Sequence, residues 1–245
     1  MRLLIVMIVL VVAGPVTAAT ATAAVRPPGD KSPLRTEQLS DETTVTRWAH
    51  GLFAAPIRSS PSAGARTVAH VRLFTEDRQF EVYLVLASEV ARDGQTWLQV
   101  RVPGRPNGRT GWTLAENLGD LEVVRTQLVI DRTALRATLT RAGKVIWSSR
   151  VGVGKSGTPT PEGHFWVRER LRNFGGGGVY GPWAFGTSAY SNISDWPRGG
   201  VVGIHGTNQP QLIPGRPSHG CIRVPNAKIK QLARLMPIGT PIQIV

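Results

Sequence analysis

The segment from His205 to Arg223 holds the residues of this chain best suited to covalent chemistry. It contains the only cysteine, Cys221, and two of the five histidines, His205 and His219. A thiol is a weak nucleophile until it loses its proton, and a neighbouring imidazole is the usual group that removes it. The segment therefore indicates a cysteine nucleophile that is served by a histidine base.

Glycines lie next to both reactive residues. Gly220 precedes Cys221, so the backbone can approach a substrate closely there, and amide N–H groups at this turn can point at a developing oxyanion. Gly206 follows His205, and its carbonyl is free to hold one imidazole nitrogen, which would fix the tautomer.

The blocks His205-Gly206-Thr207 and Ser218-His219-Gly220-Cys221-Ile222-Arg223 resemble the active site of the L,D-transpeptidases, the YkuD-type enzymes of bacterial cell-wall synthesis. The resemblance covers residues 122–245. It implies that Cys221 is the nucleophile, that His205 is the general base and that the Gly206 carbonyl orients His205.

The same resemblance implies roles for the residues around this pair. Ser218 and His219 would shape the site, although Ser218 can equally be a hydroxyl that stabilises the turn. The N–H groups of Gly220 and of the next residue would form the oxyanion hole with the Tyr180 hydroxyl. Arg223 would hold a substrate carboxylate or form a structural ion pair. A glycine-rich stretch within residues 172–198 suits a mobile flap over the site.

The implied reaction is acyl transfer on peptidoglycan. The thiolate attacks the carbonyl between the third residue of a stem tetrapeptide and its terminal D-Ala, and D-Ala leaves. The resulting thioester passes to an amine of a second stem, which gives a 3→3 cross-link that serves wall organisation and cell shape. No cofactor or metal is required, and carbapenem-type β-lactams should acylate Cys221. Transfer to water, transfer to a protein amine, and an inactive wall-binding module stay open as alternatives.

Three rival interpretations of the motifs are weaker. His205, His219 and Cys221 could ligate zinc, but no acidic general base lies nearby in the sequence. A papain-type or NlpC/P60-type protease places its cysteine before its histidine, the reverse of the order here. The stretch 152–156 ends in Gly-Lys-Ser like a phosphate-binding loop, but it lacks the earlier glycine and the helix that such a loop requires.

Composition and net charge limit the classes of binding partner that the protein can have. Apolar residues make up 41% of the 245 residues, which is enough for a globular core. The 29 Lys and Arg residues exceed the 16 Asp and Glu residues, so the net charge is +13. This charge favours anionic surroundings, and no nucleic-acid-binding motif accompanies it. The charge leads us to expect anionic wall polymers and no nucleic acid as partners, while the resemblance implies peptidoglycan stems as substrate. We also expect a monomer.

The N-terminus indicates export. Arg2 precedes an apolar run over residues 3–13, and small residues follow with Ala-x-Ala sites, which predicts a signal peptide over residues 1–23. The protein is then periplasmic or in the cell wall, or membrane-anchored if the signal is not cleaved. A lone cysteine in an exported protein forms no internal disulfide, and the Ser-His-Gly context of Cys221 favours a reactive thiol.

The remaining pattern predicts a mainly β protein of two domains. Residues 24–48 are rich in Pro, Thr and charge, which predicts a flexible linker. Residues 49–121 contain short strands and an Asn107-Gly108 hairpin that resemble a bacterial SH3-like barrel. In that barrel the rings of Tyr83, Trp97 and Trp112 would either bind the wall or fill the core.

Residues 122–245 are predicted to form the catalytic domain. Alternating strands over residues 126–131, 135–140 and 145–151 begin it, and strands over residues 164–167 and 240–245 follow. A helix is expected over residues 227–236, with Asn226 as N-cap and an apolar stripe at Ile229, Leu232, Ala233 and Met236. The predicted fold is a mixed β-sandwich of the YkuD type with one or two short helices.

Overall fold

A computed structural model describes residues 36–193, 195 and 197–245. The predicted signal peptide and the first part of the predicted linker lie outside these residues. Within them, no helix is long and apolar enough to cross a membrane.

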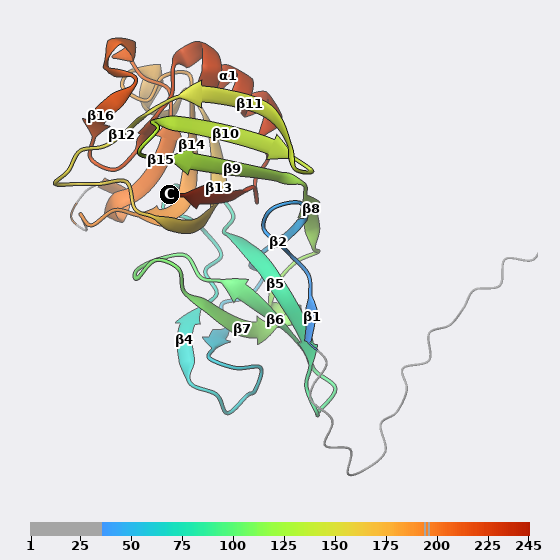
Figure 1. The fold of residues 1–245 in the computed structure, drawn as a ribbon. Helices are drawn as coiled ribbons and strands as arrows, with labels where there is room; N and C mark the ends of the chain where they lie inside the picture. Colours follow the sequence, from blue (N-terminus) through green and yellow to red (C-terminus); the bar gives the residue numbers. More distant parts are fainter. Residues whose placement is uncertain (1–35, 194, 196) are drawn as a thin grey trace, which may run out of the picture. The chain divides into compact units, whose positions relative to one another are not determined.

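The first sheet contains eight strands in the order β4-β3-β7-β6-β5-β2-β8, with β1 also paired to β5 (Figure 1). Its strands are β1 (Thr36–Gln38), β2 (Thr46–His50), β3 (Pro56–Arg58), β4 (Thr67–His70), β5 (Val82–Val90), β6 (Thr96–Arg101), β7 (Thr110–Leu114) and β8 (Glu122–Val124). The expected hairpin is present, because β6 and β7 pair antiparallel from Trp97 opposite Leu114 to Arg101 opposite Thr110. Tyr83 and Trp97 are 0% and 3% exposed, so these two rings fill the core of the sheet.

The structure differs from the expected boundaries at both ends of this sheet. Residues 36–38 and 46–48 belong to strands β1 and β2, which pair with β5, although a linker was expected over residues 24–48. Residues 122–124 pair with β2, so the first sheet extends into the segment assigned to the second domain. These strands are short, and they are held by backbone pairing with distant partners that no local pattern reveals. The SH3-like nature of this sheet stays a prediction.

The second sheet has ten strands in the order β11-β10-β9-β18-β13-β14-β15-β17-β12-β16. They are β9 (Thr126–Asp131), β10 (Arg136–Arg141), β11 (Lys144–Arg150), β12 (Gly152–Gly154), β13 (Gly163–Arg172), β14 (Trp183–Tyr190), β15 (Val201–His205), β16 (Gly215–Ser218), β17 (Ile222–Arg223) and β18 (Pro241–Ile244). Parallel pairs such as β9 with β18 and β15 with β17 occur beside antiparallel hairpins. A mainly β fold with a mixed sheet in the catalytic part is therefore confirmed.

One α-helix, α1 (Asn226–Leu235), packs on this sheet. Ile229, Leu232 and Ala233 are buried on it, and Met236 just beyond it is 1% exposed, as the apolar stripe predicts. They join one core cluster with strand residues such as Leu128, Phe185 and Ile204. This core fixes the strands that carry the candidate site.

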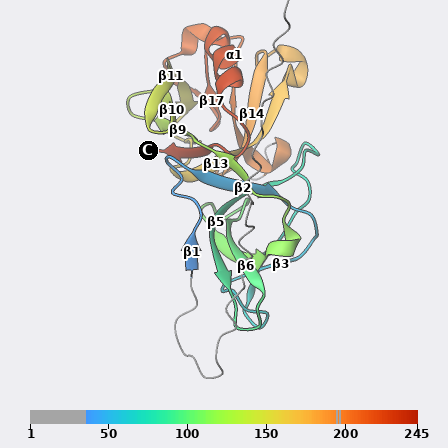
Figure 2. The same ribbon diagram turned by 90° about the vertical axis from the view of Figure 1, so that its right-hand side faces the viewer.

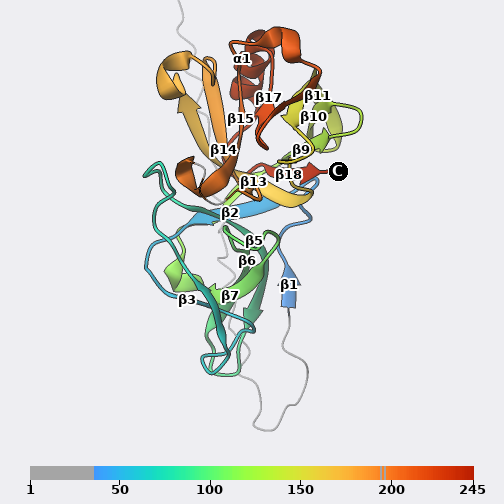
Figure 3. The ribbon, with the colours of Figure 1, turned by 90° about the vertical axis from the view of Figure 1, so that its left-hand side faces the viewer.

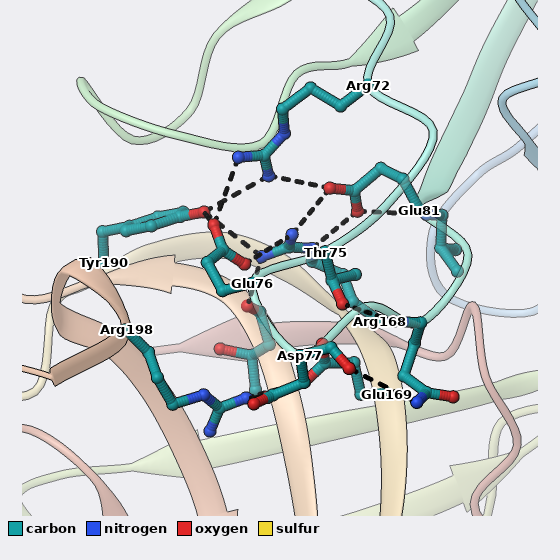
Figure 4. A network of polar contacts seen from close by, with 12 residues as sticks. Arg72, Thr75, Glu76, Asp77, Glu81, Arg168, Glu169, Tyr190 and Arg198 are labelled. Atoms are coloured by element: carbon teal, nitrogen blue, oxygen red, sulfur yellow. Dashed lines mark hydrogen bonds and ion pairs between the residues drawn. The ribbon is translucent and has the colours of Figure 1, made fainter.

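The two sheets contact each other through a small apolar cluster and a buried polar network. Val82 and Leu84 of β5 cluster with Trp166 of β13, whose indole N–H donates to the Val82 carbonyl at 2.8 Å. β2 and β13 lie close together in two side views (Figure 2 and Figure 3). Beside this cluster, Arg168 of β13 donates two hydrogen bonds to Glu81, at 2.7 Å and 2.6 Å (Figure 4).

Candidate active site

Cys221 and His205 are brought together by two adjacent parallel strands. Ile204 pairs with Ile222 and His205 with Arg223. The Gly203 N–H donates to the Cys221 Sγ at 3.4 Å. Because side chains alternate along strands, the residue two before Arg223 lies on the same face as His205. Both His205 and Cys221 line one small cavity.

Two further segments cover this cavity. The 3-10 turn η2 (Phe174–Gly177) and the following residues contribute Phe174 and Tyr180, and the turn η3 (Pro197–Gly200) contributes Arg198. The Tyr180 ring meets the His205 imidazole edge-on at 5.0 Å between centroids, and Phe174 meets Tyr180 in the same way. The cavity is small, about 40 Å³, and Cys221 itself is partly exposed.

The His205 side chain is held in one tautomer. Its Nδ1 lies 2.6 Å from the Gly206 carbonyl, which can only accept, so Nδ1 carries the proton and Nε2 keeps its lone pair. His205 is 5% exposed. Burial, with a smaller contribution from the positive charge of Arg223, lowers its pKa to about 4. The imidazole is therefore neutral at physiological pH and can accept a proton.

The Cys221 thiol is also neutral at rest. Burial raises its pKa, while the Gly203 N–H and the charges of Arg198 and Arg223 act in the opposite direction. Since the pKa of His205 is lowered and that of Cys221 is raised, the resting pair is a thiol beside an imidazole rather than a preformed ion pair. Proton transfer must accompany attack.

Ser218 and Gly220 form the turn that presents the thiol. The Ser218 hydroxyl donates to the Cys221 carbonyl at 2.6 Å and accepts the Gly220 N–H at 3.2 Å. These contacts match the turn-stabilising alternative for Ser218. They also use the Gly220 N–H, which the sequence analysis assigned to the oxyanion hole, so the Cys221 N–H remains as the expected backbone donor. His219 is exposed beside this turn.

A residue with a side chain should not be tolerated at position 220. Gly220 has a φ of 121°, and a Cβ there would lie 3.3 Å from the Ser191 Cβ. We expect Gly220→Ala to lower the free energy of unfolding by about 1–3 kcal/mol and to slow alkylation of Cys221. Gly157→Ala is the matched control, because a Cβ there meets nothing within 4 Å. Urea unfolding of both variants tests this, and equal stabilities would refute it.

Arg223 lies beside the site without a carboxylate partner. Its Nη1 donates to the Gln209 Oε1 at 2.9 Å, and its buried Nε has no acceptor among the described residues. The structural ion pair considered for Arg223 is therefore not formed within the part of the chain that the structure describes. The orphaned Nε leaves the guanidinium able to bind an anion.

Two residues near the site were not identified from the sequence. Asn226 is the first residue of α1 and not its N-cap, and its Oδ1 accepts the Thr207 N–H at 2.9 Å. It thereby fixes the loop after His205, where Gly181 and Gly206 also pack closely. Arg198 lines the cavity itself. Neither role has a local sequence signal, since both depend on contacts between distant segments.

The described residues contain no group of three or more His, Cys, Asp or Glu side chains placed to hold a metal ion. The three residues of the zinc alternative therefore do not form a ligand set there. The cavity brings together a thiol and a neutral imidazole, which are groups that acyl transfer can use.

Comparison with known proteins finds similarity to L,D-transpeptidases. The model of the YkuD family, the L,D-transpeptidase catalytic domain, matches residues 125–244. Two Bacillus subtilis (strain 168) proteins with L,D-transpeptidase designations are similar. YkuD is 28% identical over 162 residues, covering 64% of this chain and 92% of its own length. YqjB is 30% identical over 142 residues, covering 54% of this chain and 77% of its own length.

Solved structures of L,D-transpeptidases also resemble this chain. A mutant of the Enterococcus faecium enzyme is 26% identical with a TM-score of 0.39, and the match covers 49% of each chain. An enzyme from Mycobacterium tuberculosis H37Rv is 13% identical with a TM-score of 0.41, covering 62% of this chain and 90% of that one.

Proposed function

This chain belongs to the YkuD family of L,D-transpeptidases, and we propose that it transfers acyl groups between peptidoglycan stem peptides through a thioester on Cys221. The observation that carries the proposal is the His205 imidazole. It is neutral, held in one tautomer by Gly206, and lines the same cavity as the only cysteine. A wall-binding module without activity has no need of this arrangement.

The first half-reaction uses these groups in order. The His205 Nε2 takes the thiol proton while the Cys221 Sγ attacks the carbonyl between the third stem residue and D-Ala. The Cys221 N–H, with the Tyr180 hydroxyl, stabilises the oxyanion. Imidazolium formed at His205 then returns the proton to the leaving amine of D-Ala, which departs and leaves the thioester.

The second half-reaction reverses these roles. The side-chain amine of a second stem attacks the thioester, His205 accepts the amine proton, and the thiol is released with a 3→3 cross-link formed. The orphaned Nε of Arg223 makes this residue the candidate for binding a stem carboxylate. The same thioester can instead pass to water or to a protein amine, and the acceptor that reaches the opened cavity decides between these outcomes.

The proposed function also implies a cellular location and binding partners. Peptidoglycan is the substrate, so we propose that the chain is exported by its N-terminal signal to the periplasm or cell wall. There its net charge of +13 favours contact with anionic wall polymers. Carbapenem-type β-lactams are proposed to acylate Cys221 as substrate mimics.

The purified protein incubated with disaccharide-tetrapeptide tests the proposal. Mass spectrometry of the muropeptides should show a cross-linked dimer lighter by one D-Ala than two monomers. Tripeptide monomer without dimer would identify hydrolysis as the reaction. Unchanged tetrapeptide would refute acyl transfer on this substrate.

The pH dependence of D-Ala release should reflect the neutral resting pair. Since the pKa of His205 is lowered to about 4, the base stays available down to that pH and is lost below it. We expect the rate to fall on the acid side near pH 4 and to stay level through neutral pH, because the pKa of the thiol is raised. Single-turnover D-Ala release between pH 3.5 and 9 measures this. An acid limb near pH 6.5 would contradict the lowered pKa of His205.

A further inference from the structure

Arg198 is the only permanently charged side chain among the described residues that line the cavity of Cys221 and His205. It lies on η3, just before β15, and has a left-handed φ of 62°. Its guanidinium lies over the Phe174 ring, 4.7 Å from the centroid. The positive charge therefore belongs to the wall of the cavity and contacts the cover above it.

Two carboxylates contact this guanidinium, one from β13 and one from the loop between β4 and β5 (Figure 4). Glu169 of β13, which is 2% exposed, accepts a hydrogen bond from the Arg198 Nη2 at 3.0 Å. Asp77 forms an ion pair with the same Nη2. Asp77 lies in the loop between β4 and β5, so the first sheet supplies one of the two groups that position Arg198.

The loop that carries Asp77 is itself anchored to the second sheet. The neighbouring Glu76 accepts hydrogen bonds from the Tyr190 hydroxyl at 2.5 Å and from Arg168 Nη2 at 3.0 Å. Charge interaction with Arg168 and the hydrogen bond from Tyr190 outweigh burial and lower the pKa of Glu76 to about 2. Glu76 is therefore ionised, and it keeps the loop against the strand that leads into η3.

The loop between β6 and β7 also forms hydrogen bonds with the last residue of β14 and with residues between β14 and β15. Asn107 exchanges two hydrogen bonds with the Tyr190 backbone, at 2.9 Å and 3.1 Å. Arg105 donates to the carbonyls of Ser191 and Gly199, each at 2.8 Å. The residues on either side of Arg198 are thus fixed by the first sheet.

Arg198 and Arg223 both favour the Cys221 thiolate by their charge, but only Arg198 is among the described residues that line the cavity. His205 is neutral, Tyr180 is an uncharged phenol whose own pKa burial raises, and Arg223 does not line the cavity. The charged groups that face Arg198 are Asp77, Glu169 and Glu76. A guanidinium in this position favours the thiolate over the thiol.

We propose that the first sheet completes the active site, with Asp77 positioning Arg198 so that its charge stabilises the Cys221 thiolate. Asp77 is a positioning residue in this scheme, and Arg198 is the group that acts on the sulfur. The inference rests on the proposed function only in taking Cys221 as the nucleophile.

Alkylation of the full-length protein by iodoacetamide tests Arg198 without any wall substrate. Cys221 is the only cysteine, so the intact mass reports this thiol alone. Arg198→Gln should slow alkylation at neutral pH by about three- to tenfold and shift the pH profile to higher pH, with the rate at high pH unchanged. Arg198→Lys keeps the charge and should recover part of the rate. Equal pH profiles for wild type and Arg198→Gln would overturn the role of Arg198.

Asp77→Asn distinguishes a positioning role of Asp77 from a direct effect of its charge on the thiol, because the two predict opposite changes in the rate of Cys221 alkylation. Removal of a nearby negative charge alone would favour the thiolate and speed alkylation. Loss of the group that positions Arg198 should slow it, again by about three- to tenfold. Asp120→Asn, an exposed site on the same half of the chain, is the control and should match wild type. Faster or unchanged alkylation of Asp77→Asn would overturn the proposal.

These outcomes are independent of the transpeptidase assay. If wild type alkylates with the expected pH profile and the variants shift it, the inference holds even when no cross-link forms. Thermal unfolding of each variant, with a melting temperature near that of wild type, shows that an altered profile arises in the site and not from loss of the fold.

Discussion

Cys221→Ala should release D-Ala from disaccharide-tetrapeptide at a rate lower than wild type by about a thousandfold or more. No other residue can replace the lost nucleophile, because the chain has no second cysteine. The His205 imidazole and the backbone donors would stay in place, but without a sulfur they cannot form the thioester. Single-turnover D-Ala release with excess enzyme gives the measurement.

Cys221→Ser is the matched variant, since it preserves the shape of the turn. Its hydroxyl has a far higher pKa than a thiol, so the neutral His205 should activate it poorly and the rate should stay close to that of Cys221→Ala. Both variants should unfold at nearly the wild-type temperature, since the Cys221 side chain only partly fills a cavity. Release at a wild-type rate by either variant would show that another group performs the chemistry.

Glu81→Ala should cause the largest loss of stability, about 3–5 kcal/mol. Glu81 is 0% exposed and accepts hydrogen bonds from Arg168, which is 1% exposed, and from Arg72 at 2.7 Å. Truncation leaves the Arg168 guanidinium buried beside fewer carboxylates, and desolvation of an uncompensated charge is costly. Because an ordinary domain is stable by only about 5–15 kcal/mol, this is a large fraction.

Urea unfolding followed by tryptophan fluorescence measures this effect. Glu116→Ala, at an exposed position of the 3-10 turn that follows β7, is the control and should change stability by less than about 0.5 kcal/mol. The Glu81 variant should also separate the unfolding of the two sheets into distinct steps, because Glu81 links β5 to β13 (Figure 4). A loss below about 1 kcal/mol in Glu81→Ala would show that the pair contributes little.

That Cys221 and His205 lie at one cavity could be expected from the sequence, because the signals are local. Cys221 follows a glycine turn and His205 ends an apolar strand. The hairpin of β6 and β7 and the buried stripe of α1 follow from equally local patterns. The mainly β character was predictable for the same reason.

The parts that the sequence did not reveal depend on distant contacts. β1 and β2 are short strands that pair with β5, which follows them by more than 30 residues. Asn226 has the residue type of an N-cap, but the Thr207 N–H takes its side chain instead. Arg198 forms an ion pair with Asp77, which lies in the loop between β4 and β5 and far away in the sequence. Periodicity and propensity carry no information about such pairs.

A thioester on Cys221 can be detected from the intact mass of the protein, quenched in acid soon after mixing with disaccharide-tetrapeptide. We expect an adduct on Cys221 equal in mass to the donor minus D-Ala, which disappears when an acceptor amine is added and never forms in Cys221→Ala. Cross-linked product that forms without any adduct on Cys221, or in the alanine variant, would contradict a thioester mechanism.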